Sequence, residues 1–403
     1  MSKKSPQLRF EGFTDDWEER KSKDIFKPKI RKGEPDLPVL SVTQTSGVVY
    51  RDEVGIDIKY DISTLKNYKV IEPNDFVISL RSFQGGFELS DKLGITSPAY
   101  TIFVPKSPEE QNNLFWRIQF KRFQFIQSLK TVTFGIRDGK SISFNEFGEL
   151  KIKFPSNILE QQKIGAFFKK LDDTIALHQR KLDLLKEQKK GYLQKMFPKN
   201  GAKVPELRFA GFVDDWEERK LGDISYKVKE KNKTGEFTET LTNSAEYGII
   251  NQRDFFDKDI SNAKNLTGYY VVKNDDFVYN PRISNFAPVG PIKRNKLGRT
   301  GVMSPLYYVF RTHDIDKNYF EKYFDTVYWH RFMELNGDSG ARADRFAIKD
   351  SVFVEMPIPY PTMDEQQKIG SFFQQLDNTI TLHQLKLDLL KEQKKGFLQK
   401  MFA

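Results

Sequence analysis

A segment of 38 residues occurs twice in this chain, and the repeat constrains the fold more than any other feature of the sequence. Residues 160–197 match residues 365–402 at a constant offset of 205, with 31 identical positions. A second repeat precedes each variable block, since residues 6–21 match residues 205–220 at 13 of 16 positions. The chain is therefore an internal duplication of a lead-in, a variable block and a long repeated segment.

Each long repeated segment predicts one helix with an apolar seam. Alternating steps of four and three residues from Ile164 reach Met196, a heptad pattern of more than four repeats. Asn157 and Thr362 each precede a glutamate by three residues, which predicts an N-terminal capping box. Such a helix is about 50 Å long. The predicted seam consists of Ile164, Phe168, Leu171, Ile175, His178, Leu182 and Leu185 in the first copy, and of Ile369, Phe373, Leu376, Ile380, His383, Leu387 and Leu390 in the second.

We expect the two helices to pair side by side and antiparallel, because a whole domain lies between them in the sequence and can span the return. This arrangement relates the two halves of the chain by a pseudo-two-fold axis. A second apolar row makes the stripe wider than a two-stranded coil covers. We therefore expect helices of a partner protein to dock on this row, which consists of Leu177, Leu184, Leu382 and Leu389.

Polar residues interrupt both seams at matching positions. His178 and His383 can fix the register of the pair, because a slip would set them against leucine without a hydrogen-bond partner. They can equally be tolerated polar residues in a wide interface. Lys189 and Lys394 fit the same role, or extend outward into solvent. A metal-ligand role for the histidines is disfavoured, because no carboxylate or thiolate cluster accompanies them.

The two variable blocks share a skeleton but not a surface. Short β-rich runs bounded by Gly, Pro and Asn predict strands, and one helix is predicted late in each block. The sequence thus predicts the α+β class, with two similar α+β domains separated by an antiparallel pair of long coiled-coil helices. The expected segments are residues 1–155 and 199–360, the two variable domains with their lead-ins, and residues 156–198 and 361–403, the two helices.

Charge and composition limit the classes of partner and site. The chain has 65 Lys and Arg against 55 Asp and Glu, a net charge of +10, which favours nucleic acid or a membrane surface as partner. The N-terminus has no signal-like apolar core and no run of 18 apolar residues occurs, so we expect a cytoplasmic protein that does not span a membrane. The absence of cysteine excludes disulfides, thiolate metal sites and cysteine nucleophiles.

No complete catalytic or nucleotide-binding motif occurs in the chain. The "GIRDGKS" stretch at Gly135 has three residues between its glycines, whereas a phosphate loop has four. The "NPRI" stretch at Asn280 lacks the second proline and the aromatic ring of the adenine methyltransferase motif. We therefore expect no catalytic residue, no metal and no cofactor in this chain.

Loops in both variable blocks combine glycine with Arg, Asn and Gln. Arg side chains pair with guanine and Asn or Gln with adenine in the major groove, while lysines and further arginines contact phosphates. The alternative is that these charged, glycine-rich loops are simply exposed to solvent. The predicted DNA-binding residues are Arg81, Gln84, Arg137, Lys140, Asn280, Arg282, Asn285, Lys293, Arg294, Lys296, Arg342 and Arg345.

The pattern "EQQKIGAFFKKLDDTIALHQRKLDLLKEQKKGYLQKMF" with the lead-in "LRFAGFVDDWEERKLGDI" resembles the specificity subunits of type I restriction-modification systems, over essentially the whole chain. The resemblance implies two target recognition domains, each reading one half of an asymmetric bipartite site in double-stranded DNA. The paired helices are then the spacer between them. Two methyltransferase subunits would dock on the helices and supply S-adenosylmethionine and catalysis at adenine N6. Restriction subunits would join this core and cleave DNA using ATP, while the specificity subunit itself is not catalytic.

Two other classes of protein remain open. A type IIG-like restriction-methylation enzyme carries similar recognition domains joined to its own catalytic domains, and adenine methylation by the purified chain alone would indicate it. A pure scaffold would bind DNA only non-specifically, and a footprint without a bipartite pattern would indicate it.

Overall fold

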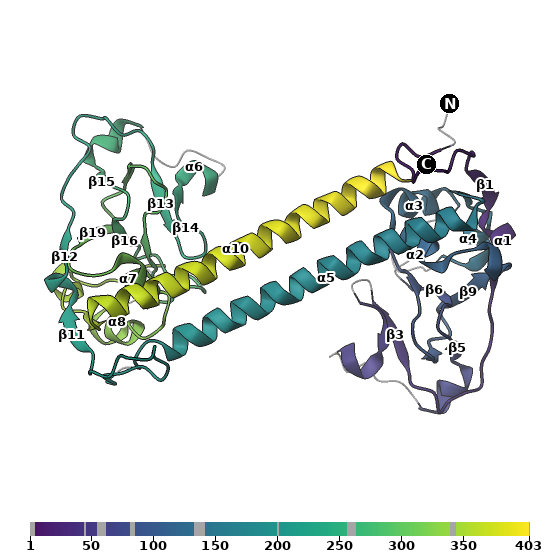
Figure 1. The fold of residues 1–403 in the computed structure, drawn as a ribbon, viewed down its shortest axis with the longest axis horizontal. Helices are drawn as coiled ribbons and strands as arrows, with labels where there is room; N and C mark the ends of the chain where they lie inside the picture. Colours follow the sequence, from purple (N-terminus) through teal and green to yellow (C-terminus); the bar gives the residue numbers. More distant parts are fainter. Residues whose placement is uncertain are drawn as a thin grey trace. The chain divides into compact units, whose positions relative to one another are not determined.

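A computed structural model gives the fold of the chain. It describes residues 5–43, 46–54, 62–80, 85–132, 142–199, 201–255, 263–338 and 344–402. Two compact units result: unit 1 comprises Met1–Gln179 and Leu385–Ala403, and unit 2 comprises Arg180–Gln384. The long helices α5 (Ile158–Lys195) and α10 (Met363–Lys400) each contribute one end to each unit (Figure 1). The four functional segments expected from the sequence stay a prediction.

The variable domain of unit 1 is built on a four-stranded antiparallel sheet with the order β2-β9-β6-β7. Its strands are β2 (Phe26–Pro28), β9 (Thr101–Pro105), β6 (Phe76–Ile78) and β7 (Phe87–Leu89). Three two-stranded sheets join β1 (Glu18–Lys21) to β10 (Lys151–Phe154), β3 (Leu40–Thr43) to β4 (Gly47–Tyr50), and β5 (Lys69–Ile71) to β8 (Gly94–Thr96). The helices are α1 (Ser22–Ile25), α2 (Asn113–Lys121), α3 (Phe123–Ser128) and α4 (Phe144–Glu149).

Unit 2 repeats this topology strand for strand. Its four-stranded sheet has the order β12-β19-β16-β17, formed by β12 (Ser225–Lys227), β19 (Tyr308–Thr312), β16 (Phe277–Tyr279) and β17 (Ile292–Arg294). The two-stranded sheets join β11 (Glu217–Lys220) to β20 (Pro357–Tyr360), β13 (Leu241–Ser244) to β14 (Gly248–Asn251), and β15 (Tyr270–Val272) to β18 (Gly301–Met303). The helices are α6 (Gln252–Phe255), α7 (Lys317–Phe324), α8 (His330–Asn336) and α9 (Asp350–Phe353).

The same turn precedes the central strand of the sheet in both variable domains. Asn74 and Asp275 have positive φ angles of 73° and 71°, a conformation that Asn and Asp tolerate better than most side chains. The next residue, Asp75 or Asp276, is buried and accepts a backbone N–H bond of 2.8 Å that closes the turn. The turn sets the start of β6 and of β16, so the central strand of each sheet enters the core at the same place.

A lead-in arginine and a helix glutamate form a buried ion pair in each unit. Arg9 donates from Nε and Nη2 to the two carboxylate oxygens of Glu160, both at 2.7 Å, and Arg208 does the same to Glu365 at 2.7 and 2.8 Å. The glutamates are 1% and 0% exposed. Removing one partner of such a pair would leave a buried charge uncompensated, at a cost of about 3 to 5 kcal/mol.

The two buried ion pairs take the place of one half of the predicted capping boxes. Asn157 accepts from Leu159 N at 2.9 Å and Thr362 accepts from Glu365 N at 3.4 Å, so both act as N-caps. The glutamate carboxylates, however, bind the lead-in arginines and do not return to the N-cap backbone. The second half of the capping-box prediction is therefore wrong, because a charged tertiary partner replaces the local one.

Two further residues of the repeated "EQQKIG" stretch, the first glutamine and the glycine, have the same structural role in both units. The Oε1 atoms of Gln161 and Gln366 accept backbone N–H bonds of 2.8 and 2.9 Å at the N-termini of α2 and α7. A Cβ on Gly165 would lie 2.8 Å from Phe115 N, and one on Gly370 would lie 2.9 Å from Tyr319 N. Only glycine allows this close approach, so the long helix crosses the same short helix in both units.

The last residues of each long helix lie in the core of a variable domain. In unit 1, Phe402 at the end of α10 stacks on Phe115 with ring centroids 5.7 Å apart. In unit 2, Phe197 at the end of α5 stacks on Tyr319 with centroids 5.4 Å apart. Both phenylalanines are at most 5% exposed. Each variable domain therefore packs on the start of one long helix and on the end of the other.

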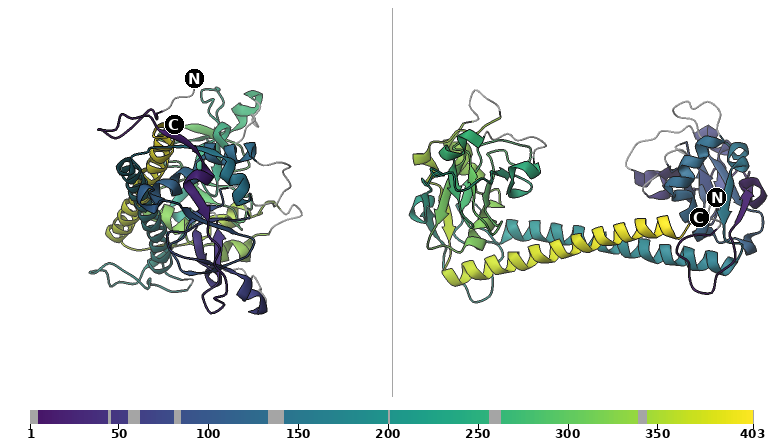
Figure 2. Two further views of the ribbon diagram at one scale, coloured as in Figure 1. Left: turned by 90° about the vertical axis from the view of Figure 1, so that its right-hand side faces the viewer. Right: turned by 90° about the horizontal axis from the view of Figure 1, so that it is seen from above.

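The helices run antiparallel within each unit. In unit 1, Lys394 near the end of α10 pairs with Asp172 in the first half of α5 at 2.6 Å. In unit 2, Lys189 near the end of α5 pairs with Asp377 at 2.7 Å. Figure 2 shows the C-terminal end of α10 in yellow beside α5 in unit 1. The predicted fold class, two similar α+β domains with an antiparallel helix pair, is confirmed, and both seam lysines form ion pairs across the pair.

Burial distinguishes the predicted seam from the flanking row. Ile164, Phe168, Leu182 and Leu185 are at most 7% exposed, as are their counterparts Ile369, Phe373, Leu387 and Leu390. The remaining seam positions, including His178 and His383, are half-buried. A role of the histidines in register stays a prediction.

One ion pair between sheet and helix has opposite polarity in the two domains. In unit 1, Glu88 on β7 pairs with Lys121 at the end of α2. In unit 2, Lys293 on β17 pairs with Asp325 just after α7 at 2.9 Å. The two pairs occupy equivalent positions. Glu88 and Lys293 lie on the equivalent strands β7 and β17, and Lys121 and Asp325 each lie nine residues after the N-cap of the equivalent helices α2 and α7. The framework thus requires a matched pair there and accepts either polarity.

The charge reversal gives a testable prediction for unit 1. Lys121→Asp sets a second carboxylate against the buried Glu88, so we expect it to lower the free energy of unfolding by roughly 3 kcal/mol. The double variant Glu88→Lys with Lys121→Asp recreates the polarity of unit 2 and is expected to recover most of that loss. Calorimetric unfolding of the two variants measures both effects. A double variant no more stable than Lys121→Asp would contradict the equivalence of the two positions.

Candidate nucleic-acid interface

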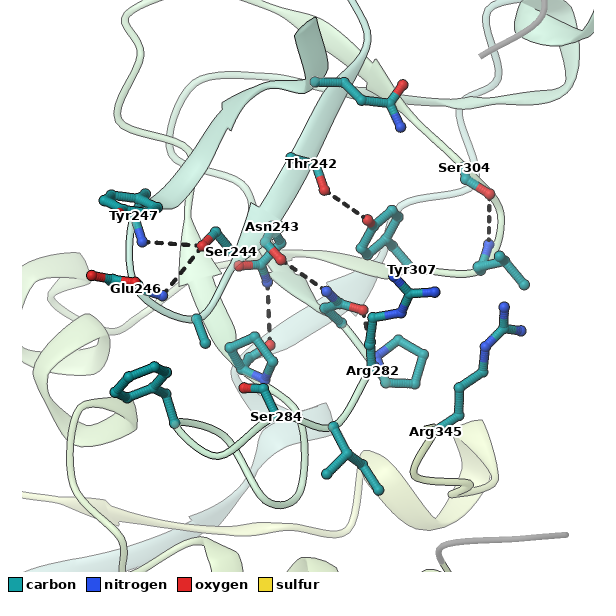
Figure 3. A pocket seen from close by; sticks show the side chains of 18 of the residues that line it. Thr242, Asn243, Ser244, Glu246, Tyr247, Arg282, Ser284, Ser304, Tyr307 and Arg345 are labelled. Atoms are coloured by element: carbon teal, nitrogen blue, oxygen red, sulfur yellow. Dashed lines mark hydrogen bonds between the residues drawn. The ribbon is translucent and has the colours of Figure 1, made fainter. Parts of the chain in front are cut away.

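A hollow of about 570 Å³ opens on the variable domain of unit 2. It is formed by the end of β13, the loop 280–291 between β16 and β17, the turn at residues 304–307, and Arg345 (Figure 3). Polar and aromatic side chains line it together, and arginine lies at its edge. The lining residues include Thr242, Asn243, Gln252, Asn280, Arg282, Phe286, Tyr307 and Arg345.

Two asparagines hold the loop 280–291 in place. Asn243, 2% exposed, donates from Nδ2 to Val278 O at 2.7 Å and to Pro291 O at 3.2 Å, so it ties β13 to both ends of the loop. Asn280 donates from Nδ2 to Asn243 O at 2.8 Å and accepts from Arg282 N at 3.0 Å. Asn280, predicted to contact DNA, therefore uses both ends of its amide within the protein.

A buried tyrosine fixes the other side of the same loop. Tyr279 donates its phenol hydroxyl to Val289 O at 2.9 Å, and burial raises the pKa of this phenol. The hydroxyl therefore stays protonated and continues to donate at any physiological pH. Held from both sides, the loop presents its central residues in one conformation.

Two predicted arginines meet at the edge of the hollow. Arg282 and Arg345 are paired through their backbones in an antiparallel bridge, and Ile283 N donates to Asp344 O at 3.0 Å. The Arg282 guanidinium lies 3.9 Å from the Asp344 carboxylate, and both side chains are more than half exposed. An exposed pair of this length contributes little, so the guanidinium can exchange its partner for an anionic ligand.

The three predicted cations of β17 and its vicinity lie outside the hollow and face α7. Arg294 is 8% exposed at its side chain and pairs with Glu321 at 2.9 Å, while Lys296 pairs with the same carboxylate at 3.1 Å. Lys293 pairs with Asp325 at 2.9 Å. Burial acts to raise the pKa of Asp325, but the charges of Lys322 and Lys293 hold the pKa below its ordinary value. These cations therefore already have anionic partners within the domain.

The remaining predicted residues divide into two groups. Asn285 is exposed at the tip of the loop 280–291. The other five lie outside the described residues, and they are Arg81, Gln84, Arg137, Lys140 and Arg342.

Sequence reasoning missed the aromatic and apolar part of the hollow. Phe286 is 78% exposed and Leu306 is 59% exposed, and both line it. Thr242 and Tyr307 share a hydrogen bond of 3.0 Å in its wall. A phenylalanine inside the turn-rich stretch "RISNFAPVG" is the signal that could have identified Phe286, since such a stretch predicts exposure.

Neither a metal centre nor a membrane span occurs in the part of the chain that the structure describes. There, no group of three or more His, Cys, Asp or Glu side chains is placed to hold a metal ion. No helix in these ranges is long and apolar enough to cross a membrane.

The family of the chain follows from comparison with known proteins. Residues 14–187 and residues 213–392 each match the type I restriction modification DNA specificity domain. The chain belongs to this family and carries two copies of its domain. The two matches coincide with the duplication and with the repeated topology of the two units.

Individual relatives agree with this assignment. The type I restriction enzyme MjaVIII specificity subunit of Methanocaldococcus jannaschii is 21% identical over 351 residues, which cover 82% of this chain and 78% of that protein. The crystal structure of the type-I restriction-modification system S subunit from M. genitalium has a TM-score of 0.61 and 14% identity, covering 99% of both chains. At this identity the second likeness concerns the fold.

The hydrogen bonds of Asn280 give a prediction that separates structural from binding roles. Asn280→Ala removes two hydrogen bonds that hold the loop, so we expect the free energy of unfolding to fall by about 1 to 2 kcal/mol. Arg282→Ala, at an exposed neighbour, should change stability by less than about 0.5 kcal/mol while weakening DNA binding. Thermal unfolding and DNA titration of both variants test this. Equal stability losses would show that Arg282, too, is structural.

Proposed function

We propose that this chain is the DNA-reading specificity subunit of a type I restriction-modification complex. Each variable domain reads one half of an asymmetric bipartite site in double-stranded DNA. The helix pair acts as the spacer between the two halves and as the docking surface for methyltransferase subunits. Restriction subunits join through that core, and the chain itself contributes no catalytic group. The complex works in the cytoplasm, where its DNA substrate is found.

The observation that carries this proposal is the duplication of a DNA specificity domain with unlike loops. Both copies have the same strand order, yet the loop after the central strand has eight residues (79–86) in unit 1 and twelve (280–291) in unit 2. One framework with two different surfaces fits two different half-sites. Spacing of half-sites by protein geometry is the general rule among two-headed DNA readers.

The reading surface in unit 2 is the hollow described above. Arginine suits guanine O6 and N7 or phosphate, and an asparagine at a loop tip suits adenine. Arg282, Arg345 and Asn285 are the predicted residues that remain candidates there. Lys293, Arg294 and Lys296 would instead support the sheet against α7, because carboxylates already neutralise them.

The exposed leucine row on the long helices supports docking of a partner. Leu177 and Leu184 on α5 are 64% and 52% exposed, and Leu382 and Leu389 on α10 are 66% and 51% exposed. Apolar residues repeated every seven positions along a helix suit a helical partner. The row occurs once on each helix, which favours two equal docking sites and therefore two methyltransferase subunits.

Mapping N6-methyladenine in cellular DNA tests the proposed function. Cells that contain this chain and its partner methyltransferase should methylate one bipartite sequence, which stays unmethylated without the chain. The double variant Arg282→Ala with Arg345→Ala should lower methylation of that sequence or relax it in one half only, since each lost base contact costs about 1 to 3 kcal/mol. Adenine methylation by the purified chain alone would contradict the proposal and favour a self-contained enzyme.

Replacing leucines of the docking row tests the partner surface. Leu184→Asn with Leu389→Asn should weaken methyltransferase binding by about tenfold or more, because apolar interface residues carry much of the binding energy. Stability of the isolated chain should hardly change, since both side chains are half exposed. Val327→Asn, at a residue 66% exposed in the variable domain of unit 2, is the control. Unchanged methyltransferase affinity in the double variant would exclude this row as the docking surface.

A further inference from the structure

Phe286 is held outward at the tip of a tight turn. Ser284 N donates to Ala287 O at 3.1 Å and Ala287 N donates to Ser284 O at 3.0 Å, so only Asn285 and Phe286 lie between the paired residues. The Phe286 side chain is 78% exposed, whereas Ala287 is 5% exposed. The turn is therefore anchored in the domain immediately behind an aromatic ring that faces solvent.

The base of this turn is rigid. Gly290 has a φ of +85°, and a Cβ there would collide with Asn280 O, so the loop closes tightly on itself. Val289, 2% exposed, packs in the core and its carbonyl accepts from Tyr279. The backbone that carries the ring is thus held before binding, which lowers the conformational entropy lost when the ring binds.

The chemistry around the ring suits a nucleic acid. Arg282 and Arg345 lie at the edge of the same hollow, and Leu306 adds a second exposed apolar side chain (Figure 3). The major groove is about 12 Å wide and admits a two-stranded β-ribbon. The turn can therefore enter the groove between phosphates that the arginines contact. In the minor groove, architectural proteins insert apolar side chains such as phenylalanine between base steps and kink the duplex, which shows that one aromatic wedge can unstack a step.

We infer that Phe286 inserts into the base stack of the half-site that the variable domain of unit 2 reads. The inference rests on the proposed function and adds a way of reading the half-site beyond hydrogen bonds to base edges. Because pyrimidine–purine steps unstack most easily, the half-site should contain such a step at the point of insertion. Phe286 is then a specificity-determining residue although it makes no hydrogen bond.

Fluorescence of 2-aminopurine tests the insertion. The full chain in complex with its methyltransferase is titrated onto duplexes that carry the mapped site with 2-aminopurine at each successive position of both half-sites. Apart from the adenines that the methyltransferase itself flips out of the stack, we expect a severalfold rise of fluorescence at one step, in the half-site whose methylation the Arg282→Ala with Arg345→Ala variant alters. Phe286→Ala should abolish this rise and weaken specific binding by about tenfold, the scale of one lost aromatic–base stack. Phe286→Trp should retain both.

Controls separate the possible failures. Val327→Ala changes another exposed apolar residue of the same domain and should behave like the unchanged chain. Specific binding without a fluorescence rise outside the methylated adenines, or such a rise that Phe286→Ala leaves intact, would overturn the inference and leave the proposed function standing. Loss of the methyltransferase from the Phe286→Ala complex on size-exclusion chromatography would overturn it in favour of a protein contact. If the unchanged complex bound no specific site, the proposed function itself would fail.

Discussion

The buried ion pair between a lead-in arginine and a helix glutamate is the interaction on which each unit depends. A carboxylate that is at most 1% exposed needs a charged partner with two well-placed donors, and the lead-in arginine supplies both donors. The lead-in is held at a second point, because Leu8 N donates to Lys400 O and Leu207 N to Lys195 O, both at 2.8 Å. In each unit, the lead-in therefore contacts both the start of one long helix and the end of the other. The arginine and the glutamate that meet there are the same in both copies, Arg9 and Arg208 in the lead-ins and Glu160 and Glu365 in the helices.

Within the variable domains, the positions of the ion pairs are the same in both units, but the residues that form them differ. The sheet-to-helix ion pair changes polarity between the units, and unit 2 adds Lys322, which bridges Asp325 and Asp377 at 2.8 Å each. The corresponding position in unit 1 is the buried Ile118, an apolar solution to the same contact. Solutions of this kind are interchangeable as long as each charge is matched. The loops after the central strands differ in length between the two units, residues 79–86 against 280–291, so they are where two reading surfaces can diverge.

Sequence alone predicted what periodicity and repetition control. The heptad pattern located α5 and α10, and the duplication predicted two domains of one fold. The capping box failed because local spacing cannot reveal that Arg9, 151 residues away, competes for Glu160. The sequence could not predict the burial of Phe402 either, because a heptad seam does not indicate which domain packs on the end of the helix. Arg294 resembles a phosphate ligand in the sequence, and only the position of α7 shows that its guanidinium is enclosed.

Two sets of exposed apolar residues, the leucine row of the long helices and Phe286 at the hollow, differ in spacing and suit different partners. The leucines of the long helices recur every seven residues on a rigid rod, so they can be covered only by another extended element with the same period. Phe286 lies on a turn two residues wide, with Leu306 and arginines of the same hollow nearby, and two protruding side chains offer too little area for a stable protein interface. A base step can unstack to admit one ring, and the neighbouring phosphates can pair with the flanking arginines. The same chain can therefore present a protein-binding surface on its helices and a DNA-binding surface on its loops without competition between them.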